Sequence, residues 1–165
     1  MGLSFTARDV FEMGVQIEAN GKNFYDAAAK KAQDPVSQQL FRDLAEWEAG
    51  HVSLFQRLRD EMPADGGELD FSDPSGESED YLRATAESHV FMREVDVAGL
   101  VVECKDQFTI LNLAITFEKD SIVFYTQMKK VVPAALGQER IDALISEEIK
   151  HIGMLIDRQK RLASR

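Results

Sequence analysis

The sequence predicts an all-α protein, a four-helix bundle in which one long crossover joins the second helix to the third. Apolar residues recur at spacings of three, four and seven in four long segments, which is the pattern of helices that bury one face. The 165 residues contain only four prolines and ten glycines, which leaves room for long helices. The connecting segments are short except for residues 63–105, and this arrangement favours a bundle with one crossover.

The first helix is expected over residues 6–32. Thr6 is a good N-cap residue, and Asp9 at the third helical position places a carboxylate near the positive end of the helix dipole. The helix should end before Pro35, because proline disfavours helical geometry in the residue that precedes it. Glu18 lies in the middle of the apolar face, where a charge is costly unless it is paired or bound to a metal.

The second helix is expected from Asp34, as its cap, to about Met62, with Pro35 in the first turn. Glu48 and His51 lie within its apolar face, one helical turn apart. Because the link to the first helix is short, the two helices should pack as antiparallel neighbours.

The connector between the second and third helices has a different composition. Residues 63–80 are acidic and rich in Gly, Pro and Ser, which is typical of turns and loops. A capped short helix is expected to follow, from Ser78 to about Phe91. Residues 99–102 are compatible with either an extended crossing segment or a short helical turn.

The third helix is expected over residues 106–131, and the fourth begins at residues 136–138 and runs almost to the end of the chain. Polar side chains again interrupt their apolar faces. Glu118 does so in the third helix, and Glu148 with His151 in the fourth.

A shift of 100 residues aligns two halves of the chain, residues 6–62 and 106–163. A packing constraint alone would preserve Leu and Ile positions and would not require a glutamate inside each apolar face. We therefore expect one domain, residues 1–165, with an internal repeat on either side of the connector. The matching positions are mainly polar or aromatic: Glu18 with Glu118, Tyr25 with Tyr125, Glu48 with Glu148, and His51 with His151.

Four carboxylates and two imidazoles suit two divalent metal ions. Oxygen-rich ligands with one nitrogen per metal favour iron or manganese, and zinc can bind such a site too. In the alternative interpretation, these side chains form solvated helix faces or a buried hydrogen-bond network. The predicted ligands are Glu18 and His51 on one ion, Glu118 and His151 on the other, with Glu48 and Glu148 as bridges.

Four further side chains accompany these candidate ligands. Tyr25 and Tyr125 follow the lone glutamates by seven residues, so they are candidates for hydrogen bonds to ligand carboxylates, for redox roles, or for packing beneath the site. Trp47 and Glu147 each precede a site histidine by four residues and could orient it. Because four carboxylates balance two doubly charged ions, metal binding is expected to stabilise the fold.

Charge and composition exclude several classes of function. A net charge of −10 repels phosphate backbones and argues against general nucleic-acid binding. No apolar stretch approaches the roughly 20 residues that span a bilayer, and residues 1–10 lack the pattern of a signal peptide. We therefore expect a soluble cytoplasmic protein without a membrane partner. Cys104 is the one cysteine and is expected in the core, and His89 is expected to be an ordinary surface or packing histidine.

The spacing of the candidate ligands resembles the ligand set of the ferritin-like di-iron carboxylate proteins: Glu18, Glu48-x-x-His51, Glu118 and Glu148-x-x-His151. More narrowly, the chain resembles the rubrerythrin-related branch, since each lone glutamate is followed by a Phe-Tyr pair, at Phe24-Tyr25 and Phe124-Tyr125. The resemblance implies a ferritin-like bundle with a di-iron centre that reacts with hydrogen peroxide or dioxygen. In rubrerythrins this reaction is peroxide reduction, and in ferritin relatives it is the oxidation of ferrous iron.

The chain departs from rubrerythrins in two respects. A rubredoxin domain needs four cysteines and Cys104 is the only one, so electrons are expected from a separate donor. Ser121 and His151 occupy places where rubrerythrins carry additional carboxylates, which makes the site more symmetric and nearer to that of bacterioferritin. The resemblance also implies a homodimer. Two alternatives to an oxidoreductase are a non-catalytic metal-handling protein and a helical scaffold with a structural zinc site.

Overall fold

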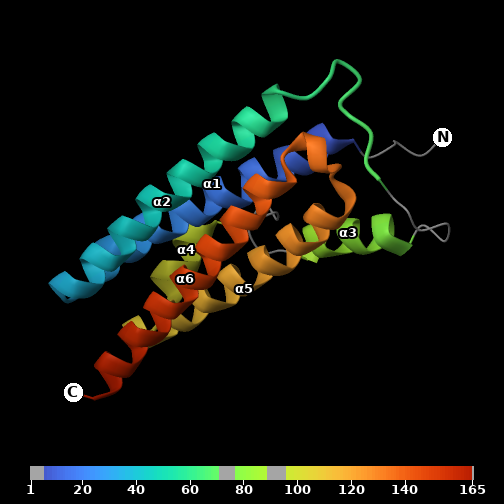
Figure 1. Cartoon of the computed structure of the whole chain (residues 1–165). Helices are drawn as coiled ribbons and strands as arrows, with labels where there is room; N and C mark the ends of the chain where they lie inside the picture. The colour runs from blue at the N-terminus through green and yellow to red at the C-terminus, as the bar shows by residue number, and fades with distance from the viewer. Residues whose placement is uncertain (1–5, 71–76, 89–95, 165) are drawn as a thin grey trace.

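The computed structural model describes residues 6–70, 77–88 and 96–164, and the predicted all-α four-helix bundle with one long crossover is confirmed (Figure 1). None of the described helices is both long enough and apolar enough to cross a membrane. The crossover contains two short helices, one more than expected, and a 3-10 turn precedes the last helix. The long helices are α1 (Ala7–Lys31), α2 (Pro35–Asp60), α5 (Gln107–Val131) and α6 (Gln138–Ala163), and the short ones are α3 (Glu77–Ser88), α4 (Val97–Glu103) and η2 (Ala134–Leu136).

Side-chain caps start three of the four long helices. The Thr6 hydroxyl accepts a hydrogen bond from the backbone N–H of Asp9, and the Asp9 carboxylate accepts one in return from the backbone N–H of Thr6. Asp34 at the start of α2 and Asp106 at the start of α5 each accept a hydrogen bond from the backbone N–H three residues later, without the return bond. These bonds satisfy N–H groups that have no partner inside the helix, which is why the helices begin where the sequence predicts.

A glycine takes the place of a side-chain cap at the start of α6. Gly137 has a φ of 107°, a left-handed conformation that other residues adopt only with strain. A Cβ atom at this position would also collide with the side chain of Leu58 in α2. Glycine thus allows η2 to continue directly into α6 close to the C-terminal end of α2.

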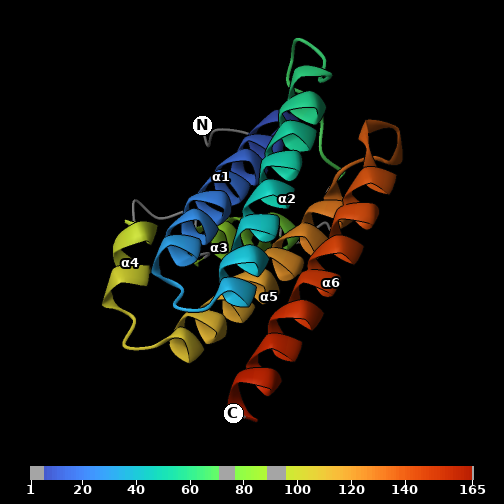
Figure 2. The same cartoon turned by 90° about the vertical axis from the view of Figure 1, so that its left-hand side faces the viewer.

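The four long helices form two helical hairpins, α1–α2 and α5–α6 (Figures 1 and 2). Aromatic side chains join the two hairpins in the core. Phe24 of α1 packs edge to face against Phe117 of α5, with ring centroids 5.0 Å apart. Phe55 of α2 lies 5.2 Å from Tyr125 of α5. Gly14 of α1 makes room for Phe55, because a Cβ atom there would lie 2.6 Å from its ring. Each fully buried phenylalanine contributes roughly 1.5–3 kcal/mol to stability.

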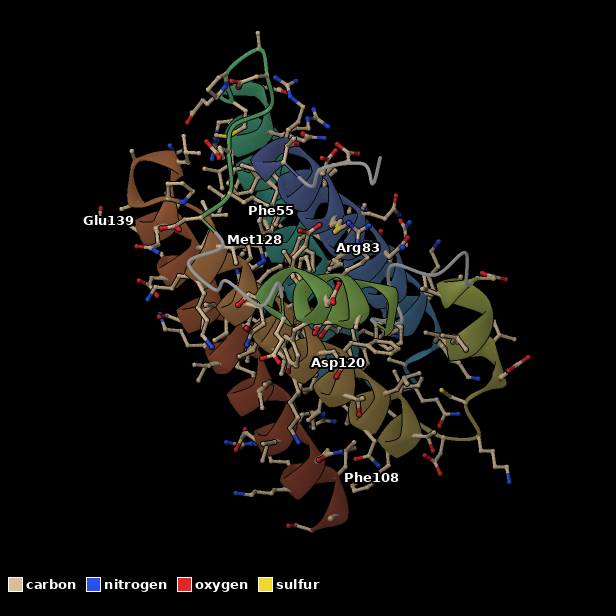
Figure 3. The ribbon with its side chains drawn as sticks, turned by 90° about the vertical axis from the view of Figure 1, so that its right-hand side faces the viewer. Phe55, Arg83, Phe108, Asp120, Met128 and Glu139 are labelled. Atoms are coloured by element: carbon tan, nitrogen blue, oxygen red, sulfur yellow. The ribbon has the colours of Figure 1, made fainter. Side chains whose placement is uncertain are left out.

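The first crossover helix, α3, lies against α5 (Figure 3). Leu82 of α3 is fully buried, and this apolar contact holds a helix whose first turn is acidic against the bundle. The predicted start at Ser78 agrees with the structure to within one residue. The predicted end at Phe91, like His89, lies outside the described residues.

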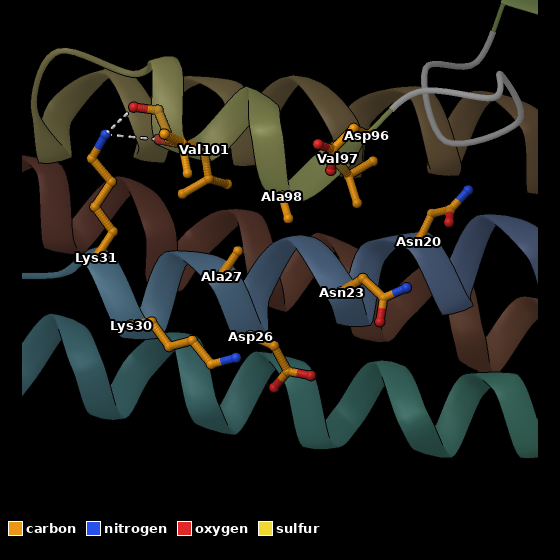
Figure 4. Close-up of a pocket in the computed structure, with 11 residues that line it drawn as sticks. Asn20, Asn23, Asp26, Ala27, Lys30, Lys31, Asp96, Val97, Ala98 and Val101 are labelled. Carbon is orange, nitrogen blue, oxygen red and sulfur yellow. Dashed lines mark hydrogen bonds between the residues drawn. The ribbon is translucent and has the colours of Figure 1, made fainter.

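The second crossover helix, α4, lies against α1 and resolves the two alternatives for residues 99–102 in favour of a helical turn. The ammonium group of Lys31 donates hydrogen bonds to the carbonyl oxygens of Val101, Val102 and Cys104, at 2.9, 2.6 and 2.7 Å. A cation at the C-terminal end of a helix satisfies carbonyl groups that have no partner within it. Cys104 itself is buried and free. A surface groove of about 740 Å³ is lined by residues of both α1 and α4 (Figure 4).

An ion pair between buried Arg158 and partly buried Asp34 helps to join three of the long helices at one end of the bundle. Arg158 of α6 donates from Nη2 to Asp34 Oδ1 and from Nε to Ser37 Oγ, both at 2.7 Å. Gln107 of α5 donates to Asp34 Oδ2 at 2.9 Å and also to Ser37. Burial alone would raise the pKa of Asp34, but these hydrogen bonds hold it well below its usual range. We call these four residues the Asp34 cluster.

Candidate metal centre

The structure brings all six predicted ligands together in the middle of the bundle. Each long helix contributes one or two of them, and the six residues are only 1–5% exposed. A charged side chain at this depth requires partners or a metal ion. Their role as ligands stays a prediction, whereas their convergence is an observation. We call this set the Glu/His cluster: Glu18, Glu48, His51, Glu118, Glu148 and His151.

The Glu/His cluster divides into two groups of four residues, each with its ligand atoms within 4.8 Å of one another. Glu48 and Glu148 belong to both groups, and each offers a different oxygen to each histidine. In the first group, the Nδ1 atom of His51 lies 3.4 Å from Glu18, 3.4 Å from Glu48 and 3.1 Å from Glu148. This sharing is the geometry that two bridging carboxylates require.

The second group repeats the first on the other side of the two shared glutamates. Here the Nδ1 atom of His151 lies 3.0 Å from Glu148 Oε2, 3.7 Å from Glu118 Oε1 and 3.8 Å from Glu48 Oε1. The two imidazole rings are 5.6 Å apart, between centroids, and inclined by 22°. Both histidines therefore present Nδ1, and not Nε2, to the carboxylates.

Two buried atoms of the Glu/His cluster make no hydrogen bond to any residue that the structure describes. They are His51 Nδ1 and Glu148 Oε1, which lie 3.1 Å apart. Buried polar atoms are nearly always hydrogen-bonded, so an exception calls for an explanation. A divalent cation bound to both atoms would supply it, and the oxygen-rich donor set with one nitrogen per group fits such an ion.

The electrostatics of the Glu/His cluster are dominated by burial and by its surplus of acid. Burial raises the pKa of Glu48 and of Glu118 well above the usual range, and the neighbouring carboxylates raise it further. Burial lowers the pKa of His151, but Glu118 and Glu148 outweigh it and raise the pKa to about 9. The pKa of His51 is raised in the same way. Without a metal the cluster therefore retains protons, which a metal ion must displace.

Two buried tyrosines hold the glutamates that are not shared, and each reaches across from the opposite repeat. The hydroxyl of Tyr25 in α1 donates to Glu118 Oε1 in α5, and the hydroxyl of Tyr125 in α5 donates to Glu18 Oε1 in α1. Burial raises the pKa of both tyrosines well above 10.0, and the carboxylates add to the effect, so both remain O–H donors. Of the three roles considered for these tyrosines, hydrogen bonding to the carboxylates is the one the geometry supports directly.

The prediction that Trp47 and Glu147 orient the histidines of their own helices was wrong. We expected each to orient the histidine four residues later in its own helix, but each contacts the histidine of the facing helix. Glu147 of α6 lies 2.8 Å from Nε2 of His51 in α2. The indole of Trp47 in α2 stacks on His151 in α6, with ring centroids 5.2 Å apart and planes inclined by 11°. Spacing along one helix shows that two residues share a face, but it does not show which side chain of the facing helix reaches each histidine.

The Glu/His cluster is approached from the surface between α2 and α6. A cavity of about 530 Å³ lies there, and its lining includes His151 itself. The larger groove between α1 and α4 is lined by none of the six candidate ligands (Figure 4). Proximity to the cluster and not size therefore identifies the relevant opening. The lining of the smaller cavity consists of Trp47, Glu147, Lys150, His151 and Met154.

Comparison with known proteins agrees with this fold. A solved structure from Thermotoga maritima, described as a ferritin-like diiron-carboxylate protein, matches with a TM-score of 0.69, 18% identity, and coverage of 97% of this chain and 98% of that chain. The chain thus has the ferritin-like fold. The sequence profile of the family described as Rubrerythrin matches residues 9–99, more than half of the 165 residues, and the chain belongs to the rubrerythrin family. No curated protein matches it. The predicted rubrerythrin-related, ferritin-like resemblance is confirmed.

Proposed function

We propose that the protein is a non-haem di-iron oxidoreductase that reduces hydrogen peroxide or dioxygen with electrons from a separate donor. The observation that carries this proposal is the pair of four-residue groups that share Glu48 and Glu148. Two further facts support it. Buried atoms of His51 and Glu148 make no hydrogen bond within the described residues, and the chain belongs to the rubrerythrin family.

Each residue of the Glu/His cluster has a defined role in this proposal. Glu18 and His51 would hold one ion, and Glu118 and His151 the other. The shared glutamates would bridge the two ions, and the four negative charges would balance two doubly positive ions in a site that excludes most water. Tyr25 would keep the Glu118 carboxylate in its orientation by hydrogen bonding.

The chemistry requires two electrons. Reduction of one hydrogen peroxide to two waters, or of one dioxygen to one hydrogen peroxide, takes two electrons and two protons, and two bound ferrous ions would supply one electron each and polarise the O–O bond. Within these 165 residues Cys104 is the only cysteine, so a four-cysteine iron site cannot be built from them. The donor that restores the electrons would therefore lie outside these residues.

A structural zinc site in a helical scaffold is the second candidate. It is favoured by one observation, the burial of the six candidate ligands to 1–5% exposure, because structural metal sites are closed to solvent. The cavity that reaches His151 favours the first candidate, because a reactive site must admit its substrate. Elemental analysis of protein purified from its native source distinguishes zinc from iron or manganese.

Anaerobic loading with ferrous iron, followed by stopped-flow mixing with hydrogen peroxide or with dioxygen, tests the proposed reaction. We expect two irons per chain and oxidation faster than that of free ferrous iron, with the faster oxidant identifying the substrate. Glu48→Gln should abolish this acceleration. Glu46→Gln is the matched control, because Glu46 is an exposed glutamate of the same helix. Oxidation no faster than that of free iron would overturn the proposal.

A further inference from the structure

The two halves of the Glu/His cluster are surrounded almost symmetrically, with one exception. Glu18, Tyr25, Glu48 and His51 all recur 100 residues later as identical residues. The two positions that contact the histidines from the facing helix do not recur, since residue 47 is tryptophan and residue 147 is glutamate. The structure places these two unlike side chains against equivalent histidines, Glu147 on His51 and Trp47 on His151.

Glu147 lies against the nitrogen of His51 that faces away from the other carboxylates. The Nδ1 atom of His51 faces three carboxylates at 3.1–3.4 Å, and Nε2 lies 2.8 Å from Glu147 Oε2. With its proton on Nε2, the imidazole donates to Glu147 and turns the Nδ1 lone pair toward the ion. A carboxylate in this position fixes the tautomer of a ligand histidine and makes it a stronger donor. The side chain of Glu147 is 53% exposed, so the hydrogen bond matters more here than the screened charge.

Trp47 acts on His151 in a different way. Its ring lies nearly parallel to the imidazole, at 5.2 Å, and restricts the tilt of the histidine without accepting a proton from it. The part of the chain that the structure describes provides no hydrogen bond to Nε2 of His151, and this histidine lines the cavity between α2 and α6. Lys150 lines the same cavity and adds a positive charge on this side.

We propose that the two metal positions are inequivalent, that the His51 position binds its ion first and more tightly, and that Glu147 is the positioning residue that makes it so. This inference rests on the proposed di-metal function. Loss of a carboxylate that supports a ligand histidine typically lowers metal affinity about 10–100-fold, so the two binding steps should differ by a factor of that order. The weaker position would be that of His151, which lines the cavity between α2 and α6.

Titration of metal-free protein with Co²⁺, followed by calorimetry and by visible absorption, tests the inference without any turnover. We expect two steps that differ about 10–100-fold in affinity. Glu147→Leu should weaken the tighter step by a similar factor and leave the other unchanged. Trp47→Glu gives His151 its own carboxylate and should tighten the weaker step. Trp47→Phe, which keeps an aromatic ring, is the control and should leave both steps in their original order.

The order of filling can be assigned residue by residue. The chain has three histidines, so their imidazole nitrogen resonances can be resolved and assigned with the variants His51→Gln and His151→Gln. At one equivalent of Zn²⁺, Nδ1 of His51 should shift and Nδ1 of His151 should not. In Glu147→Leu the two should shift together.

The outcomes separate this inference from the proposed function. If no Co²⁺ or Zn²⁺ binds, the di-metal function itself fails. If two ions bind in one step with equal affinity, or if Glu147→Leu weakens both steps equally, the positions are equivalent and only the inference fails. Filling of the His151 position first would also overturn it.

Discussion

Two buried polar clusters in this bundle differ in how completely their atoms are paired. In the Asp34 cluster one positive and one negative charge meet, and Arg158 donates to Asp34 and to Ser37 at 2.7 Å. In the Glu/His cluster four carboxylates surround two imidazoles, and two buried atoms make no hydrogen bond to the residues described. Both clusters join helices that are distant in sequence, so burial and connectivity alone do not distinguish them.

The comparison shows how a structural polar cluster differs from a binding site. A fully paired cluster gains nothing from a ligand and serves to fix the ends of α2, α5 and α6. A cluster with surplus acid and unpaired atoms is costly until a cation joins it. Metal removal should therefore destabilise the fold through the Glu/His cluster alone. Loss of one charged partner should destabilise the fold mainly through the Asp34 cluster.

Removal of metal should have the largest effect on stability. At a free metal concentration of 100 times Kd, each bound ion stabilises the folded state by about 2.7 kcal/mol, or about 5 kcal/mol for two independent ions. For a chain of this size that corresponds to a rise of roughly 10–20 °C in Tm. Differential scanning calorimetry with Mn²⁺ and then with a chelator measures it. An unchanged Tm would contradict a metal role for the Glu/His cluster.

The metal-free protein should lose stability as the pH rises. The pKa of His151 is about 9 in the folded state and about 6.5 in the unfolded state, so its contribution is complete below about pH 6.5 and disappears as the pH passes 9. Its upper limit is on the order of 3 kcal/mol. The raised pKa values of Glu48 and Glu118 act in the same direction. Urea unfolding with a chelator at pH 6 and pH 9 measures the decrease.

The Asp34 cluster should show the opposite pH dependence. The folded-state pKa of Asp34 is depressed, so its contribution is present above the unfolded value of about 3.9 and is lost as the pH falls through the lower folded value. With metal bound, the pH dependence of the Glu/His cluster should reverse, because protons then compete with the metal. In the metal-free protein, an increase in stability from pH 6 to pH 9 would contradict the raised pKa values of His151, Glu48 and Glu118.

Arg158→Met should destabilise the metal-free protein by about 2–4 kcal/mol, because it leaves a largely buried carboxylate without its cation. Arg158 is 4% exposed, so solvent cannot replace it. Chemical denaturation gives the value, and metal titration of the same variant should still show two ions per chain. Arg161→Met is the matched control, since Arg161 is exposed on the same helix and should change stability by less than about 0.5 kcal/mol. A loss of metal stoichiometry in Arg158→Met would show that the two clusters are coupled.

Tyr25→Phe and Tyr125→Phe should each cost about 1–2 kcal/mol, because each removes one hydrogen bond to a buried carboxylate. The two variants also compare the halves of the Glu/His cluster. Tyr25→Phe should weaken the ion held by Glu118, and Tyr125→Phe the ion held by Glu18. Metal titration separates the two effects, and identical changes in both steps for both variants would contradict the crossed pairing.

Glu48→Gln should have the smallest effect on the metal-free protein and still impair metal binding. Burial and the neighbouring carboxylates raise the pKa of Glu48, so this carboxyl holds a proton more readily than an exposed one, and glutamine has nearly the shape of the protonated form. We expect a change in stability within about 1 kcal/mol, together with a loss of metal affinity of about 100-fold or more. A large loss of metal-free stability would assign Glu48 a structural role like that of Asp34.

The helices and the candidate ligands were predictable because their signals, helix caps and charged residues within apolar faces, lie within single helices. Thr6, Asp34 and Asp106 cap helices through hydrogen bonds that span only three residues, which sequence spacing reveals directly. Glu18 and Glu118 were recognisable as ligand candidates because a charge inside an apolar face is costly, and the repeat placed two such charges in equivalent positions.

Contacts between helices were decided by the tertiary structure. Tyr25 and Glu118 are 93 residues apart, His51 and Glu147 are 96 apart, and Asp34 and Arg158 are 124 apart. Hydrophobic periodicity states which face of a helix is buried but not which helix covers it, so the partners of Glu147 and Arg158 could not be read from spacing. The sequence by itself determined the helices and the six candidate ligands. The packing of α2 against α6 and of α1 against α5 decided which side chain supports each ligand, because those contacts exist only once the bundle has closed.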